Sequence, residues 1–179
     1  MVAKLENNFN VVVEWMPFYL RPDTPPEGME LPDYIKKSMA SGSDNRLKEL
    51  AALYGLEFVH PGRIINTRLA HESFEYAKEM GKGREFHAAV FNKVYGQGQD
   101  VSKWEVLRKT AEEMQLDPEE MQTKVMSGIY TRAVNEKVQT ASKIGVTGVP
   151  TYVINDQYAI VGAQPYEVFI NALDQILKK

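Results

Sequence analysis

Hydrophobic positions change their spacing twice along the chain, and each change marks a new kind of structure. An apolar run at Phe9–Met16, which contains three consecutive valines, predicts a β-strand that is buried on both faces. The residues before it, Val2–Leu5, are typical of the last turns of a helix, which Asn7 and Asn8 end. Proline and glycine recur through the next stretch, Pro17–Gly28, and predict an extended loop.

After this loop the apolar residues recur at helical spacing as far as Gly145. Ala70, Phe74 and Ala77 share one face of a predicted helix. Further along, Asp117 followed by a proline supplies an N-cap and a first-turn proline for another helix. More than half of the chain is therefore predicted to be a block of consecutive helices.

The spacing becomes that of strands at Pro150. Thr151–Ile154 and Tyr158–Val161 flank an Asn-Asp turn and predict a β-hairpin, and Pro165 opens a final helix. A strand, a large helical insertion, a hairpin and a helix together predict an α/β fold in which helices cover a sheet.

Composition narrows the classes of function. The chain has 179 residues, of which 44% are hydrophobic and 25% charged, as is typical of a soluble globular protein. A net charge of −3 gives no electrostatic reason to expect nucleic acid or an anionic membrane as a partner. No apolar run approaches the length of a membrane span. No export signal is visible at the start, which favours the cytoplasm.

The sequence contains no cysteine, and this limits its chemistry. A thiolate nucleophile, a redox dithiol, a disulfide and a zinc–thiolate site are all excluded for these residues. His60, His71 and His87 lack metal-ligand spacing, so we expect no metal site.

The strongest local motif is Gly145–Tyr152, in which two glycines precede an X-Pro bond and a strand. Taken alone, it is typical of a helix-to-strand loop with a trans proline, because only about 5–6% of X-Pro bonds in folded proteins are cis. The stretch also resembles the G-V-x-G-V-P-T-[FY] signature of DsbA-family thioredoxin-fold proteins. Gly162–Pro165 resembles the entry to the final helix of that family. Phe18–Pro22 and Asn66–His71 resemble the P-F-x-L-x-P and N-T-x-x-A-H segments of its FrnE-like branch.

The resemblance implies a thioredoxin-like sheet that lacks its first strand, together with a large all-helical insertion domain. Family members begin with a strand and a C-x-x-C (or S-x-x-P-like) turn, whereas this chain begins in the later part of the helix that follows the turn. The absent strand would be central, between Phe9–Met16 and the strand after Pro150. We therefore expect residues 1–30 and 145–179 to form a partial thioredoxin-like domain and residues 31–144 to form the helical domain.

The resemblance also implies where a substrate would bind. The Val149–Pro150 bond would be cis, and Val149 would expose its backbone to a substrate or to glutathione. Asn66 and Thr67 would lie at the mouth of the same cleft, although helix capping alone explains these two residues equally well. No catalytic residue is expected, because the dithiol segment is absent. No bound cofactor is expected either, except glutathione under one alternative.

Three functions remain open. The chain is expected to be a member of the DsbA/FrnE-like thiol–disulfide oxidoreductases, or dithiol–disulfide isomerases, that is redox-inactive without cysteine. The first alternative is a glutathione-dependent isomerase or transferase of the 2-hydroxychromene-2-carboxylate isomerase or kappa type. The second is a non-catalytic binding or dimerisation module. The expected partners are accordingly protein thiols and disulfides, or glutathione.

The absent central strand has one further consequence. A strand at Phe9–Met16 would expose an unpaired edge, which proteins tend to cover, pair or swap. We expect it either to pair directly with Thr151–Ile154 or to pair across a homodimer.

Overall fold

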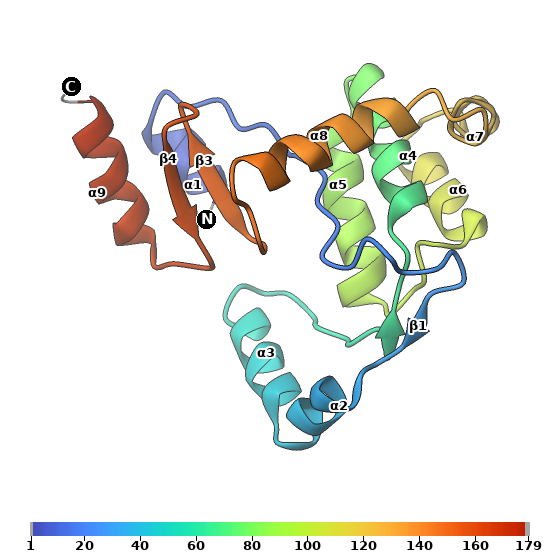
Figure 1. Cartoon of the computed structure of the whole chain (residues 1–179), viewed down its shortest axis with the longest axis horizontal. Helices are drawn as coiled ribbons and strands as arrows, with labels where there is room; N and C mark the ends of the chain where they lie inside the picture. The colour runs from blue at the N-terminus through green and yellow to red at the C-terminus, as the bar shows by residue number, and fades with distance from the viewer. Residues whose placement is uncertain (1, 178–179) are drawn as a thin grey trace. The chain divides into compact units, whose positions relative to one another are not determined.

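The computed structural model describes residues 2–177 of the chain. It divides into two compact units (Figure 1). Residues up to Leu20 and from Glu136 onward form one, called the hairpin unit, and Arg21–Asn135 form the other, called the helical unit. The domain borders expected from sequence were 30/31 and 144/145. The border after Asn135 instead lies inside α8 (Thr131–Lys143), because this continuous helix belongs to both units.

The two strands that the sequence predicts after the helical block lie in the hairpin unit, and they form as expected. β3 (Thr151–Ile154) pairs antiparallel with β4 (Tyr158–Val161). The turn residues Asn155 and Asp156 both have positive φ, 51° and 55°, which is the backbone that matches the twist of a tight hairpin. The sequence-predicted hairpin and its bounds are confirmed.

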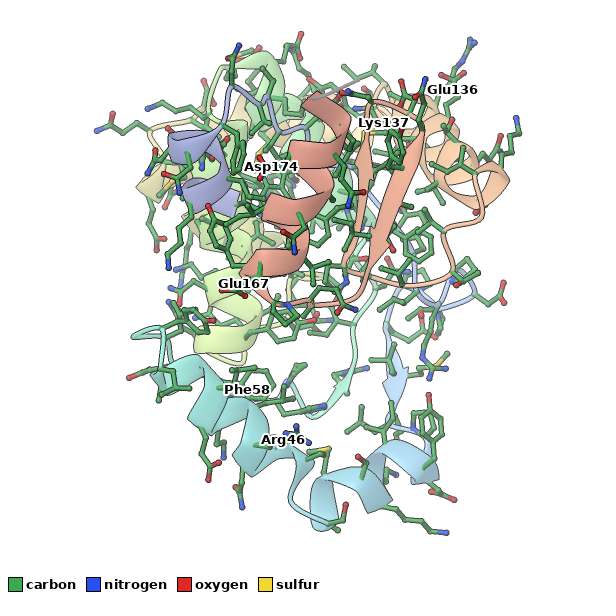
Figure 2. The ribbon with its side chains drawn as sticks, turned by 90° about the vertical axis from the view of Figure 1, so that its left-hand side faces the viewer. Arg46, Phe58, Glu136, Lys137, Glu167 and Asp174 are labelled. Carbon is green, nitrogen blue, oxygen red and sulfur yellow. The ribbon has the colours of Figure 1, made fainter. Side chains whose placement is uncertain are left out.

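The core of the hairpin unit lies between the hairpin and two helices, α1 (Val2–Asn8) and α9 (Tyr166–Leu177). Phe169 is 1% exposed, and its ring meets the Tyr152 ring edge-to-face at 4.8 Å. Leu5 and Leu173 complete the buried cluster. On the outer side of α9, Glu167 and Asp174 are exposed (Figure 2). The helix is therefore amphipathic, and its apolar face covers one face of the hairpin.

The prediction that Phe9–Met16 forms a strand of a sheet is wrong. Among the described residues, none from 10 to 16 joins a ladder, and β3 is paired with β4 alone. The side chains of Phe9–Met16 nevertheless alternate strictly between partly buried and exposed, as they do in a strand. The apolar pattern thus sets which side chains turn inward, but a ladder also needs a neighbouring strand, and no strand among residues 2–177 pairs with the segment.

The helical unit packs around α4 (Arg68–Glu79). Ala77, Phe86, Leu107 and Met121 are all completely buried there. The two-residue strands β1 (Met29–Glu30) and β2 (Arg63–Ile64) pair with each other. β1 lies just before the predicted helical domain, residues 31–144, and β2 lies inside it. The other elements of the unit are α2 (Asp33–Ala40), α3 (Ser43–Ala52), α5 (Gly83–Phe91), the π-helical turn η1 (Asn92–Gly96), α6 (Trp104–Glu113) and α7 (Pro118–Met126). The expected α/β fold with a large helical insertion is confirmed, although the insertion also contains the short strand β2.

Charged groups buried in the helical unit are paired. Glu72 is completely buried, and both of its carboxylate oxygens lie 3.0 Å from the Arg68 guanidinium. The Thr131 hydroxyl donates to the same carboxylate at 2.8 Å. Because an unpaired buried carboxylate is costly, these bonds fix the first turn of α8 against α4.

Tyr76 is the largest side chain buried in this unit, at 1% exposed. Its hydroxyl donates to the Glu120 carboxylate at 2.9 Å, and the Lys124 ammonium lies 5.4 Å from its ring centroid. The pKa of Tyr76 is raised to about 12. Burial is the largest cause, and the hydrogen bond to Glu120 and the charge of Glu120 add to it. Burial and the hydrogen bond to Glu79 likewise raise the pKa of Tyr130.

Alkaline pH is therefore expected to destabilise the protein. In the unfolded chain Tyr76 loses its proton near pH 10.0, whereas in the folded chain it keeps the proton to about pH 12. The unfolded state is thus favoured progressively as pH rises through this window. Urea unfolding followed by circular dichroism should show a free energy of unfolding that falls with pH above 10, and Tyr76→Phe should reduce that slope. Tyr54→Phe, at a residue that is 72% exposed, serves as the control. An unchanged slope in Tyr76→Phe would contradict the assignment.

Candidate functional site

The Val149–Pro150 loop begins where α8 ends. Gly145 has a φ of 83°, which a glycine adopts without strain, and the Val146 N–H donates back to the Ala141 carbonyl at 3.0 Å. This bond closes the C-terminus of the helix and turns the chain outward. Val149 is consequently 52% exposed at the end of the loop.

The peptide bond between Val149 and Pro150 is cis, the isomer that the family resemblance implies. The Pro150 carbonyl accepts a hydrogen bond from the Gly162 N–H at 2.8 Å, just past the end of β4. The Thr151 hydroxyl donates to the Gly148 carbonyl at 2.7 Å. Within the part of the chain that the structure describes, nothing hydrogen-bonds to the backbone of Val149. The loop is thus fixed on both sides of an exposed residue whose own backbone groups are available to a ligand.

A shallow groove of about 180 Å³ lies beside this loop, on the face of the hairpin opposite α9. Its floor is made by alternate hairpin residues, including Thr151, Val153 and Val161. Ile144 and Val146 form part of its wall. Val146 belongs to the Gly145–Tyr152 motif, whereas Ile144 lies outside it and was not predicted to line a site. The sequence did contain a signal for the groove. Ile144 and Val146 are apolar side chains at the predicted end of the helix, where a solvent-exposed turn is expected.

Asn66 holds a loop of the helical unit in place. Its side-chain NH₂ donates to the Thr24 carbonyl at 2.6 Å, and its side-chain oxygen accepts from the Arg68 N–H at 3.0 Å. Thr67 occupies the N-cap position of α4, but its side chain makes no capping hydrogen bond. The capping interpretation therefore applies to Asn66 rather than to Thr67. Sequence reasoning missed Thr24, which is buried and whose carbonyl is the partner of Asn66.

The four predicted site residues divide between the units. Val149 and Pro150 belong to the hairpin unit, and Asn66 and Thr67 belong to the helical unit. Each pair is positioned by contacts within its own unit. A cleft shared by all four remains a prediction from the resemblance.

The described residues offer no metal centre. Within residues 2–177, no group of three or more potential protein ligands is placed to hold a metal ion. His87 lies between Phe74 and Phe91, with ring centroids 6.0 and 4.6 Å away, and burial lowers its pKa. These contacts are those of a neutral, packed side chain. None of the helices in the same range is sufficiently long and apolar to cross a membrane.

Comparison with known proteins identifies relatives along almost the whole chain. The model of the DSBA-like thioredoxin domain matches residues 1–174. YwbO, an uncharacterized protein of Bacillus subtilis (strain 168), is 32% identical over 173 residues, which cover 95% of this chain and 84% of YwbO.

Similar solved structures include an oxidoreductase and an isomerase. The crystal structure of a probable DsbA oxidoreductase from Streptomyces coelicolor has a TM-score of 0.80 and 26% identity, and the match covers 90% of this chain and 74% of that one. The structure of a 2-hydroxychromene-2-carboxylate isomerase has a TM-score of 0.78 and 20% identity to this chain. The match covers 99% of this chain and 87% of the isomerase chain. At that identity the isomerase shows the shared fold alone.

The contacts of Asn66 predict a measurable contribution to stability. Asn66→Ala removes the hydrogen bonds to Thr24 and Arg68 and leaves their groups unpaired, so we expect the free energy of unfolding to fall by about 1–2 kcal/mol. Thr67→Ala should cost less, about 0.5 kcal/mol or under, because no capping bond is lost. Urea titration of both variants provides the comparison. Equal stability of Asn66→Ala and the parent protein would show that the two bonds do not hold the loop.

Proposed function

The chain belongs to the DSBA-like thioredoxin domain family, and from this premise we propose that it binds substrate without exchanging disulfides itself. In this proposal it is a DsbA/FrnE-like relative of the thiol–disulfide oxidoreductases or dithiol–disulfide isomerases. Exchange requires a thiolate to attack a disulfide sulfur, and the 179 residues contain no cysteine. Binding, by contrast, needs only surface and backbone groups that the chain has.

The observation that carries the proposal is Val149, which is 52% exposed and whose backbone makes no hydrogen bond within the described residues, in the loop next to the groove. An extended peptide can pair its own backbone with such a segment, as in recognition by strand addition. One apolar side chain of the peptide would then fit over Val153 and Val161 in the groove, where burial of apolar surface adds affinity. The proposed ligands are unfolded or extended segments of proteins that carry thiols or disulfides.

Glutathione is the alternative ligand at the same loop. It is itself a short peptide, so the Val149 N–H and carbonyl, which make no hydrogen bond within the described residues, suit it by the same chemistry. This alternative corresponds to a glutathione-dependent isomerase or transferase, and the isomerase neighbour supports it through the shared fold. A binding or dimerisation module without catalysis is the third candidate, which the lack of cysteine supports. We further propose a cytoplasmic location and partners other than nucleic acid or membrane, on the family resemblance and the net charge of −3.

The redox part of the proposal is tested by insulin reduction. We expect the purified chain to leave the rate of insulin precipitation by dithiothreitol unchanged, because it has no thiol to form a mixed disulfide. Any acceleration that is proportional to protein concentration would refute redox inactivity.

The binding part is tested with S-alkylated insulin B chain, an unfolded peptide that cannot exchange disulfides. Isothermal titration should detect binding, and Val153→Glu should weaken it about tenfold, equivalent to about 1.4 kcal/mol. Val168→Glu, at a valine of similar exposure on α9 and outside the groove, should bind like the parent protein. Binding of reduced glutathione but not of the B chain would favour the alternative, and binding of neither would overturn both.

A further inference from the structure

The groove of the hairpin unit changes in character from one end of β3 to the other. Its floor residues share one face of the hairpin, as the antiparallel register requires, and they are Thr151, Val153, Ala159 and Val161. β3 leads from the Val149 loop to the turn that joins it to β4 (Figure 1). The turn adds Asp156 and Gln157 to the lining. The groove thus has an apolar floor and a polar end at the turn, away from the loop.

Asp156 is the one charged residue among those that line the groove. Within the described residues its carboxylate has no ion pair and no hydrogen-bond partner. The turn itself does not need this charge, because Asp156 has a φ of 55°, a backbone that asparagine and glycine also favour. An ionised carboxylate is purely an acceptor, and it binds charged donors more strongly than neutral ones. The charge at the end of the groove is therefore available to a cationic ligand.

The apolar part of the groove has room for one side chain. Its volume is about 180 Å³. An apolar cavity of about 150 Å³ inside a protein holds a molecule of the size of benzene. Val153 and Val161 on the floor are 42% and 62% exposed, so a ligand side chain placed over them removes apolar surface from water. A cation that reaches Asp156 must then come from another residue of the same ligand.

We propose that Asp156 selects extended peptide segments in which a lysine or an arginine lies two residues from the apolar side chain in the groove. Side chains two residues apart in an extended chain point to the same side and lie about 7 Å apart. An apolar side chain over Val153 therefore brings the cation towards the turn, three residues further along the hairpin. The flexible stem of lysine or arginine covers the remaining distance to the carboxylate.

This inference rests on the proposed function, because it names the class of segment that the groove accepts. A neutral side chain at the same position of the ligand leaves the carboxylate in water, and an acidic one meets a like charge. Asp156 is exposed, so the preference is modest. An exposed charge pair changes affinity by about two- to fivefold and is screened by salt.

Fluorescence anisotropy with labelled, end-blocked peptides tests the preference. Each peptide is a run of threonines, which favours the extended conformation, with one leucine and one variable residue two positions away, in both chain directions. In the better direction, the lysine peptide should bind about threefold more tightly than the glutamine peptide, and the glutamate peptide more weakly than either. The preference should disappear in about 1 M sodium chloride. Lysine placed next to the leucine points to the other side of the chain and should give no preference.

Asp156→Asn removes the charge and keeps a residue that suits the turn. The lysine and glutamine peptides should bind this variant equally well. Asp174→Asn, at an exposed residue of α9 outside the groove, changes the net charge by the same amount and should keep the threefold preference.

The outcomes separate this inference from the proposed function. Equal binding of the lysine and glutamine peptides to the parent chain would overturn the selectivity and leave peptide binding standing. A preference that persists in Asp156→Asn would show that another group provides it and would overturn the role of Asp156. If neither these peptides nor the S-alkylated B chain bind, the proposed function fails, and the inference fails with it.

Discussion

The contact between α9 and the hairpin, made by Phe169 against Tyr152, is the interaction on which the hairpin unit depends. A two-stranded hairpin is marginally stable by itself in water, so β3 and β4 need a layer to pack on. Phe169 and Leu173 supply it from α9, and Leu5 adds the contribution of α1. Because aromatic pairs combine large buried area with a preferred geometry, this contact also fixes how the hairpin lies on the helix.

The position of the candidate site follows from that packing. β4 is held on α9, and the Gly162 N–H just after it holds the Pro150 carbonyl. The loop is tied in this way to the end of a packed strand rather than to other loops, which keeps the exposed Val149 in one place. The site of this unit is thus made largely from backbone groups held by a core, and it has no cysteine thiol. That is why its proposed role is recognition.

Sequence reasoning succeeded where local chemistry decides the structure. The Asn-Asp turn, the alternating hairpin residues and the N-cap at Asp117, whose carboxylate accepts from two backbone N–H groups, are all set by neighbours within a few residues. It failed for Phe9–Met16, because the pattern of side chains specifies a strand conformation while the pairing depends on a partner elsewhere. The bond from Asn66 to Thr24 joins residues 42 positions apart, and no local signal points to such a contact. The border between the units inside α8 could not be predicted either, because the spacing of apolar residues does not change within a continuous helix.

The two units differ in how their polar groups are paired. The pairs in the helical unit stabilise its structure, whereas the loop of the hairpin unit is the candidate for function. In the helical unit the buried charges are neutralised internally, Glu72 by Arg68 and Lys93 by Glu113 at 2.6 Å. In the hairpin unit, by contrast, the backbone near Val149 and along residues 11–16 lies outside any ladder. Backbone groups outside a ladder can pair with an extended chain of any sequence, which is the basis of the recognition proposed at Val149. The hairpin unit therefore combines a packed core with an exposed loop at Val149, and that loop is where the proposed recognition is to be tested.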